Sequence, residues 1–241
     1  MKNFVLISVF CVFALAAVAL AGGQSSLGQP APPPSKAKTA VPSAQNAATK
    51  LDTQLFTAIE NADTAAAAQL LDQGAHVDAQ NEQGYTPLMG AVAMGRMDIV
   101  KLLLDKNATP ALADKTGRTA LHYAAMTGNL DAAKLLMDKN APVNAKDSDG
   151  FTPLMYSIVS HNIDLVNLLL QKGADPWAHD AHGFTSLMAA SGGGFTDIVK
   201  ALLDHGAGVN DKSDDGTTAL ALATGNHHAE VADLLRAKGG Q

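Results

Sequence analysis

Cysteine is nearly absent from this chain of 241 residues, since Cys11 is its single thiol. That residue lies inside an apolar stretch at the N-terminus, so a chain from which the stretch is removed has no thiol at all. Disulfide bonds and a cysteine nucleophile are therefore excluded from such a mature protein. The lack of thiols is compatible with an oxidising compartment.

Catalytic motifs are lacking as well. The sequence holds no G-x-S-x-G and no H-E-x-x-H, the patterns of a serine hydrolase and a zinc protease. His179 with His182, and His227 with His228, come nearest to a metal site, but neither group has a third ligand assured by the sequence. We therefore expect a protein that is not an enzyme and that binds neither a metal nor a cofactor.

Acidic residues are missing from the first 51 positions. Of the 17 basic residues, Lys2, Lys36, Lys38 and Lys50 precede Asp52, which leaves 13 basic against 23 acidic residues from there on, a formal charge of −10. Such a surface repels phosphate backbones, so nucleic acid is not expected as a partner. The charge favours a protein partner with a basic patch.

Aromatic residues make up only 5% of the sequence, whereas hydrophobic residues make up 47%, and much of that fraction is alanine. Close packing of short helices by Ala and Leu accounts for both values. An ordered core is therefore expected in spite of the few rings.

What the sequence does contain is a repeat with a period of 33 residues. Glycines at this spacing open the segments GYTPLM, GRTALH, GFTPLM, GFTSLM and GTTALA, and complete units begin at residues 81, 114, 147, 180 and 213. An apolar run in each unit closes on Gly or Asn, the residues that best tolerate the left-handed conformation at a helix end. The closing residues are Gly74, Asn107, Asn140, Gly173, Gly206 and Gly239.

A 33-residue unit with a turn glycine, T-P-L-H-x-A and two short helices resembles the ankyrin repeat. The best matches are Thr86-Pro87-Leu88, Thr119 with Leu121, His122 and Ala124, and Thr152-Pro153-Leu154. The resemblance covers residues 51–241 and implies a mainly α fold, a solenoid of stacked helix-turn-helix units with β-hairpin or turn fingers. Residues 51–80 lack the opening G-x-T-P-L and are expected to form an N-terminal capping repeat.

Two departures from the family pattern carry expectations of their own. The family histidine occurs only as His122, where the resemblance implies hydrogen bonds to Thr119 and to the neighbouring unit. Met replaces it in three units and is expected to pack as an apolar side chain. In the last unit, Gly225 and Asn226 predict a shorter inner helix.

The N-terminus has the pattern of a secretory signal peptide over residues 1–21. Lys2 supplies the positive start, residues 4–20 are apolar apart from Ser8, and Ala19-Leu20-Ala21 is an A-x-A cleavage site. The alternative is an uncleaved membrane anchor, since about 17 apolar residues are the lower limit for crossing a bilayer. Residues 22–50, rich in Pro and Ala, are expected to form a disordered linker. With a cleaved signal peptide, the repeat domain is expected to lie in the periplasm or to be secreted.

A candidate binding face follows from the place just after each turn glycine, which repeats in every unit and therefore forms a row. It holds Tyr85, Arg118, Phe151 and Phe184, side chains of the kinds that anchor protein interfaces. The neighbouring candidates are Glu82, Gln83, Asp149 and His182 on the fingers, with Met94 and Met126 towards the inner helices. The alternative is that the rings pack sideways against the next finger. Trp177 likewise either packs on the finger base or is an exposed anchor.

These features predict a protein–protein interaction module, an exported monomeric adaptor or scaffold that binds a protein partner through its concave finger and inner-helix face. An inhibitor or immunity-type antidote of a periplasmic or secreted enzyme is the alternative. A purely structural spacer outside the cytoplasm is a third reading.

Overall fold

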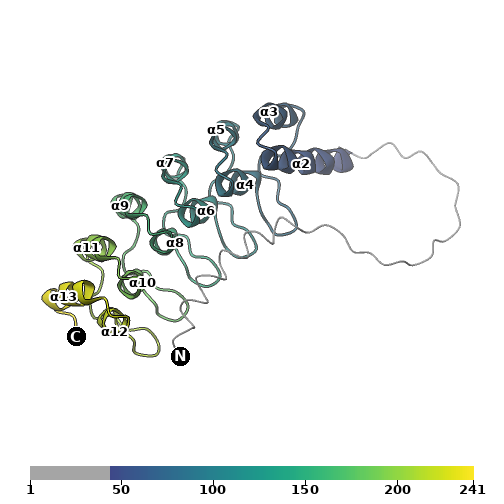
Figure 1. Ribbon diagram of the computed structural model, residues 1–241. Coiled ribbons are helices and arrows are strands. Elements are labelled where there is room, and N and C mark those ends of the chain that lie inside the picture. Colours follow the sequence, from purple (N-terminus) through teal and green to yellow (C-terminus); the bar gives the residue numbers. More distant parts are fainter. Residues whose placement is uncertain (1–43) are drawn as a thin grey trace, which may run out of the picture. The chain divides into compact units, whose positions relative to one another are not determined.

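The computed structural model describes residues 44–241, with side chains from Thr49 on, and the predicted signal peptide and residues 22–43 lie outside this range. The helices form two rows (Figure 1). The inner row holds α2 (Ala44–Glu60), α4 (Pro87–Ala93), α6 (Ala120–Met126), α8 (Pro153–Val159), α10 (Ser186–Gly193) and α12 (Ala219–Gly225). The outer row holds α3 (Thr64–Asp72), α5 (Met97–Asp105), α7 (Leu130–Asp138), α9 (Ile163–Gln171), α11 (Thr196–Asp204) and α13 (Ala229–Ala237).

The row of inner helices begins earlier than the sequence indicates. Helix α2 starts at Ala44, inside the segment assigned to the linker, and runs to Glu60. Between residues 44 and 241, no helix combines the length and the apolar character needed to cross a membrane.

The core lies between the two rows. Leu88 and Leu121 from the inner helices and Ile99, Leu103 and Leu136 from the outer ones are fully buried. Burying each such side chain contributes roughly 1.5 to 3 kcal/mol relative to exposure. Because every unit packs on its neighbours in this way, the expected stacked helix-turn-helix solenoid is confirmed.

Threonine fixes the start of the inner helices. The Oγ of Thr86 accepts a hydrogen bond from the Met89 N–H at 3.2 Å, and the same bond recurs at Thr152, Thr185 and Thr218. Proline occupies the first helical position of α4 and α8, where a missing N–H costs nothing.

The expected shortening of the last inner helix is wrong. Helix α12 has seven residues, the same number as α4, α6 and α8. The reason is that His227 takes a φ of 65°, the value that Gly95 takes at the same place in the first complete unit. The turn therefore stays at its usual position, and Gly225 remains inside the helix.

The fingers between the units are turns rather than strands. Among residues 44–241 the only bridges are isolated, joining Ala113 to Thr119 and His179 to Thr185. Gly150, at a φ of 85°, shows why the turn glycine is needed, because a Cβ there would also come within 2.9 Å of the Ala181 nitrogen.

Backbone hydrogen bonds tie each finger to the next. The donors are the N–H groups of Lys115, Ser148, Ala181 and Asp214, and the acceptors are the carbonyl oxygens of Gln83, Thr116, Asp149 and His182, at distances of 2.8 to 3.0 Å. We call these four bonds the finger ladder. Because the ladder uses main-chain atoms alone, the side chains at the finger tips are free to differ from unit to unit.

Candidate functional site

The residues that follow the turn glycines form a row along the inner-helix face, and each of them is half-buried. The Tyr85 ring meets the Tyr123 ring of the next unit edge-on, with centroids 5.1 Å apart and an interplanar angle of 87°. The Tyr85 hydroxyl donates to the Met89 carbonyl at 3.2 Å. Burial, followed by the charge of Asp114, raises the pKa of Tyr85, so this side chain stays neutral at physiological pH.

Arg118 crosses the boundary to the next unit. Its Nε lies 3.3 Å from Oδ2 of Asp147, and its guanidinium carbon lies 5.6 Å from the centroid of the Tyr156 ring. The Asp147 side chain is completely buried, and it also accepts hydrogen bonds from the Tyr156 hydroxyl at 2.7 Å and from the Phe151 N–H at 2.9 Å. Four groups, with the Asp149 N–H, therefore satisfy one buried carboxylate.

The same arrangement occurs one unit earlier. The Tyr123 hydroxyl donates to Oδ2 of Asp114, and the Arg118 N–H donates to Oδ1 of that carboxylate at 3.0 Å. The sequence interpretation missed both tyrosines. The signal that was present is an Asp followed nine residues later by a Tyr in two consecutive units.

The row residues thus contact rings of the inner helices. Phe151 lies 5.6 Å from the Tyr156 ring centroid, tilted by 37°. Tyr85, Arg118 and Phe151 are held by framework contacts, yet each keeps part of its surface exposed. Phe184 is also half-buried and makes no ring contact within the described part of the chain.

The predicted finger residues lie fully at the surface. Glu82, Gln83, Asp149 and His182 are exposed, and their side chains form no hydrogen bond or ion pair with any other described residue. Glu82 and Gln83 lie on the first finger of the finger ladder, Asp149 on the third and His182 on the fourth, so the ladder places them along one side of the stack. Met94 and Met126, by contrast, lie half-buried at the far ends of α4 and α6.

His122 belongs to the framework, as the resemblance implied. Its Nδ1 lies 3.0 Å from both the backbone N and the Oγ of Thr119, and its Nε2 lies 3.1 Å from the Phe151 carbonyl in the next unit. Burial lowers the pKa of His122, against the opposing hydrogen bond to Phe151 and the charge of Asp147. Where Met89 replaces the histidine, its sulfur accepts the Thr86 N–H at 3.5 Å.

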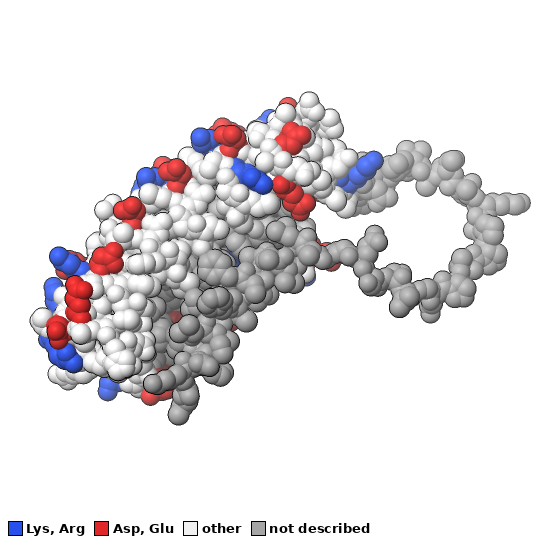
Figure 2. All heavy atoms as spheres, in the orientation of Figure 1, with Lys and Arg blue, Asp and Glu red and all other residues white. Residues whose placement is uncertain are grey.

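Charge on the outer row is paired along the stack. Figure 2 shows Lys, Arg, Asp and Glu side chains gathered mainly over the outer helices. Ion pairs join Asp72 to Lys106 at 2.7 Å, Asp138 to Lys172 at 3.3 Å and Asp204 to Lys238 at 3.5 Å. These exposed pairs each contribute roughly 0 to 1 kcal/mol.

Trp177 lies in the loop after α9 and is 53% exposed. At the same place in other units, Asn144 donates to the Gly173 carbonyl at 3.0 Å and accepts from the Asp175 N–H at 2.8 Å. Asn210 makes the equivalent pair of bonds. The indole supplies neither, so this tie between outer loops is missing at Trp177.

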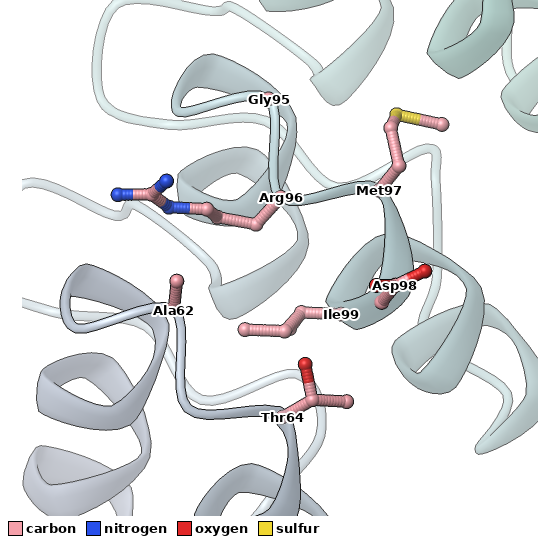
Figure 3. A pocket seen from close by; sticks show the side chains of 7 residues that line it. All are labelled: Ala62, Thr64, Gly95, Arg96, Met97, Asp98 and Ile99. Atoms are coloured by element: carbon pink, nitrogen blue, oxygen red, sulfur yellow. The ribbon is translucent and has the colours of Figure 1, made fainter.

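A pocket of about 280 Å³ lies between the helix turns of the first two units (Figure 3). Arg96 extends along it, away from Met97 and Asp98. Its Nη2 is 3.4 Å from the Glu60 carbonyl, and its Nε is buried with no hydrogen-bond partner in the described part of the chain. The pocket is open and mixes a cation with the Asp98 carboxylate. In residues 44–241 no three metal-ligating side chains come together.

Comparison with known proteins agrees with this architecture. A family model described as ankyrin repeats, in three copies, matches residues 37–114, 108–180 and 178–241. Among solved structures, the chain is similar to the ankyrin repeat domain of Bcl-3, a member of the IkappaB protein family. The two are 31% identical with a TM-score of 0.71, and the match covers 79% of this chain and 87% of the other. No curated protein sequence matches the chain significantly.

Proposed function

The chain belongs to the ankyrin-repeat family, whose repeats indicate a protein–protein interaction module, and from this premise we propose that it is an exported adaptor that binds one protein partner along its fingers. The observation that carries the proposal is the set of exposed finger side chains, among them Gln83 and His182, that form no hydrogen bond or ion pair within the described chain. Side chains without a structural task are available for recognition.

The groups that hold the repeats together are different from the side chains exposed on the fingers, and this separation supports the proposal. The main-chain finger ladder and the carboxylates of Asp114 and Asp147 hold the repeats in register, while the side chains of Glu82, Gln83, Asp149 and His182 form no hydrogen bond or ion pair in that framework. The formal charge of −10 from Asp52 onward favours a partner whose contact surface is basic. We propose a monomer that presents this face to such a partner.

Export is the second part of the proposal, and it rests on the signal-peptide pattern of residues 1–21. Expression of the full chain in a bacterial host, followed by mass spectrometry of the intact protein from the periplasmic fraction, tests it. A mature chain that begins at Gly22 is the expected product. A full-length chain that stays with the membrane fraction would point to the anchor instead.

Site-specific photo-crosslinking tests the binding face. A photo-reactive residue at Gln83 or His182 is expected to capture the same protein in cells, and the matched control is a photo-reactive residue at Lys134, which is exposed on α7 in the outer row. The side chains at these two positions form no hydrogen bond or ion pair with the framework, whereas the Phe151 ring packs against Tyr156. Capture of one partner from both fingers and not from Lys134 supports the proposal, whereas equal capture from all three positions contradicts it.

A further inference from the structure

Three of the five complete units open with an aspartate, and its carboxylate has different partners along the stack. Asp114 and Asp147 each receive a tyrosine hydroxyl from the position nine residues later. In the next unit, Asp180 binds its own turn in the same way, accepting the N–H groups of His182 and Phe184 at 2.8 Å on Oδ1. The position nine residues later is Ala189, which has no hydroxyl.

The second partner is missing too. Oδ2 of Asp147 is reached by Arg118 from the preceding unit, but the residue one repeat after Arg118 is Phe151. Oδ2 of Asp180 consequently has no hydrogen-bond or ion-pair partner among the described residues. The nearby Lys146 ammonium donates to the His179 carbonyl at 2.9 Å and forms no ion pair with Asp180.

Repeat geometry shows what surrounds this free oxygen. The Tyr156 ring lies between Arg118 of the preceding unit and Phe151 of its own, at 5.6 Å from each. By the same geometry, position 189 lies between Phe151 and Phe184, and there the ring is reduced to a methyl group.

The next turn of α10 on this side is, by contrast, occupied by neighbouring side chains. Gly192 and Gly193 lie three and four residues after Ala189, on the same side of the helix. A Cβ on Gly192 would be in ordinary van der Waals contact with Asn226 at 3.7 Å and Leu222 at 3.8 Å, and a Cβ on Gly193 would meet the Phe195 ring at 2.6 Å, so the gap left by the missing tyrosine ends at Ala189. We call the half-buried set of Asp180, Phe151, Phe184 and Ala189 the α10 notch.

We propose that the α10 notch receives an arginine side chain of the partner protein, an inference that rests on the proposed function and specifies it. The guanidinium bonds to the free Oδ2 of Asp180 and lies against the faces of Phe151 and Phe184, as Arg118 does on Asp147 and Tyr156. The acidic character of the domain selects a cation over a phenol. The planar guanidinium is favoured over an ammonium group because it stacks on rings.

Binding of a small probe tests the notch without knowledge of the partner. The full chain is titrated with the blocked tripeptide acetyl-Gly-Arg-Gly-amide, and NMR shifts of the Ala189 methyl group report binding. The same titration is run with tripeptides that carry Lys or Tyr in the middle. Asp180→Asn is expected to weaken binding of the arginine probe at least about fivefold. Asp164→Asn removes an equal charge from exposed α9 and is expected to have no effect.

Filling the notch provides the second variant. Ala189→Tyr places a phenol where α6 and α8 have one, so the new hydroxyl is expected to bond to Asp180, to raise the melting temperature and to abolish binding of the arginine probe. Equal binding of the arginine, lysine and tyrosine probes, or arginine binding unchanged in both Asp180→Asn and Ala189→Tyr, would overturn the inference.

The adaptor function and the arginine-binding notch can be disproved separately. If the arginine probe binds at the notch but no partner is crosslinked at Gln83 or His182, the notch stands and the adaptor function falls. If a partner is crosslinked and its capture is unaffected by Asp180→Asn and Ala189→Tyr, the adaptor function stands and the arginine notch is wrong.

Discussion

Arg118 reaches across a repeat boundary to Asp147, with Nε 3.3 Å from Oδ2 of a carboxylate that is fully buried. A buried charge of this kind is tolerated only where hydrogen bonds satisfy it, and Asp147 has four. The contact therefore connects the finger of one unit to the finger of the next. It is part of the framework on which the proposed binding face depends.

Loss of the carboxylate should be costly. Asp147→Ala leaves the Arg118 guanidinium and the Tyr156 hydroxyl without their acceptor, and we expect the free energy of unfolding to fall by about 3 kcal/mol. Urea unfolding followed by circular dichroism measures this. The control is Asp138→Ala, which removes an exposed partner of Lys172 and should cost less than about 1 kcal/mol. Similar losses in the two variants would contradict the framework role of Asp147.

Acid should destabilise the repeats through His122. The pKa of this buried side chain is lowered from its ordinary value of 6.5, so the unfolded chain binds a proton at a pH where the folded chain does not. Stability is complete above about pH 6.5 and falls as the pH drops through that value, with a slope of at most about 1.4 kcal/mol per pH unit for one proton.

The variant His122→Met isolates this effect. Methionine occupies the same place in three other units. In two of these units, the sulfur atoms of Met89 and Met188 accept the threonine N–H. The variant is expected to remain folded and to lose less stability than the parent chain between pH 7 and pH 5. Parallel curves of stability against pH for the two proteins would show that His122 is not the titrating group.

Helix α10 contains two buried hydroxyls, on Ser186 and Ser191, that have no hydrogen-bond partner among residues 44–241. Other units place the buried Val92 and Ile158 at the position of Ser191. Ser191→Val should therefore raise the free energy of unfolding by about 1 to 2 kcal/mol, because an unsatisfied polar group is replaced by apolar contact. Ser191→Ala, which only removes the hydroxyl, should gain less. A loss of stability in both variants would mean that the serine is satisfied.

Trp177→Asn should restore a pair of hydrogen bonds between neighbouring outer loops. An amide at this position is expected to bond to the Gly206 carbonyl and the Gly208 N–H, as Asn144 does with its neighbours, and to add about 1 kcal/mol of stability. Thermal unfolding measures the gain. If partner capture at Gln83 disappears while stability rises, the exposed indole is a binding anchor, and unchanged capture would exclude that role.

The 33-residue period of the sequence was sufficient to predict the architecture. The residues that begin and end each helix act through local contacts. The left-handed φ of Asn107 and Asn140 at helix ends and the cap that Thr86 gives to α4 each depend on residues within one turn. The direction of the row side chains could not be predicted in this way. Whether Tyr85 points outward depends on Tyr123 in the following unit, and the chain satisfies Asp147 with groups from two units. A pattern that is read unit by unit does not show such pairings.

The finger ladder has one more consequence. Its four main-chain bonds fix the step from one tip to the next, so neighbouring tips cannot slide independently to suit whatever they touch. The finger tips therefore favour a ligand whose own contact groups recur at the same spacing. A ligand whose contact groups are spaced differently binds less well. Selectivity then comes from spacing as much as from the identity of any single side chain.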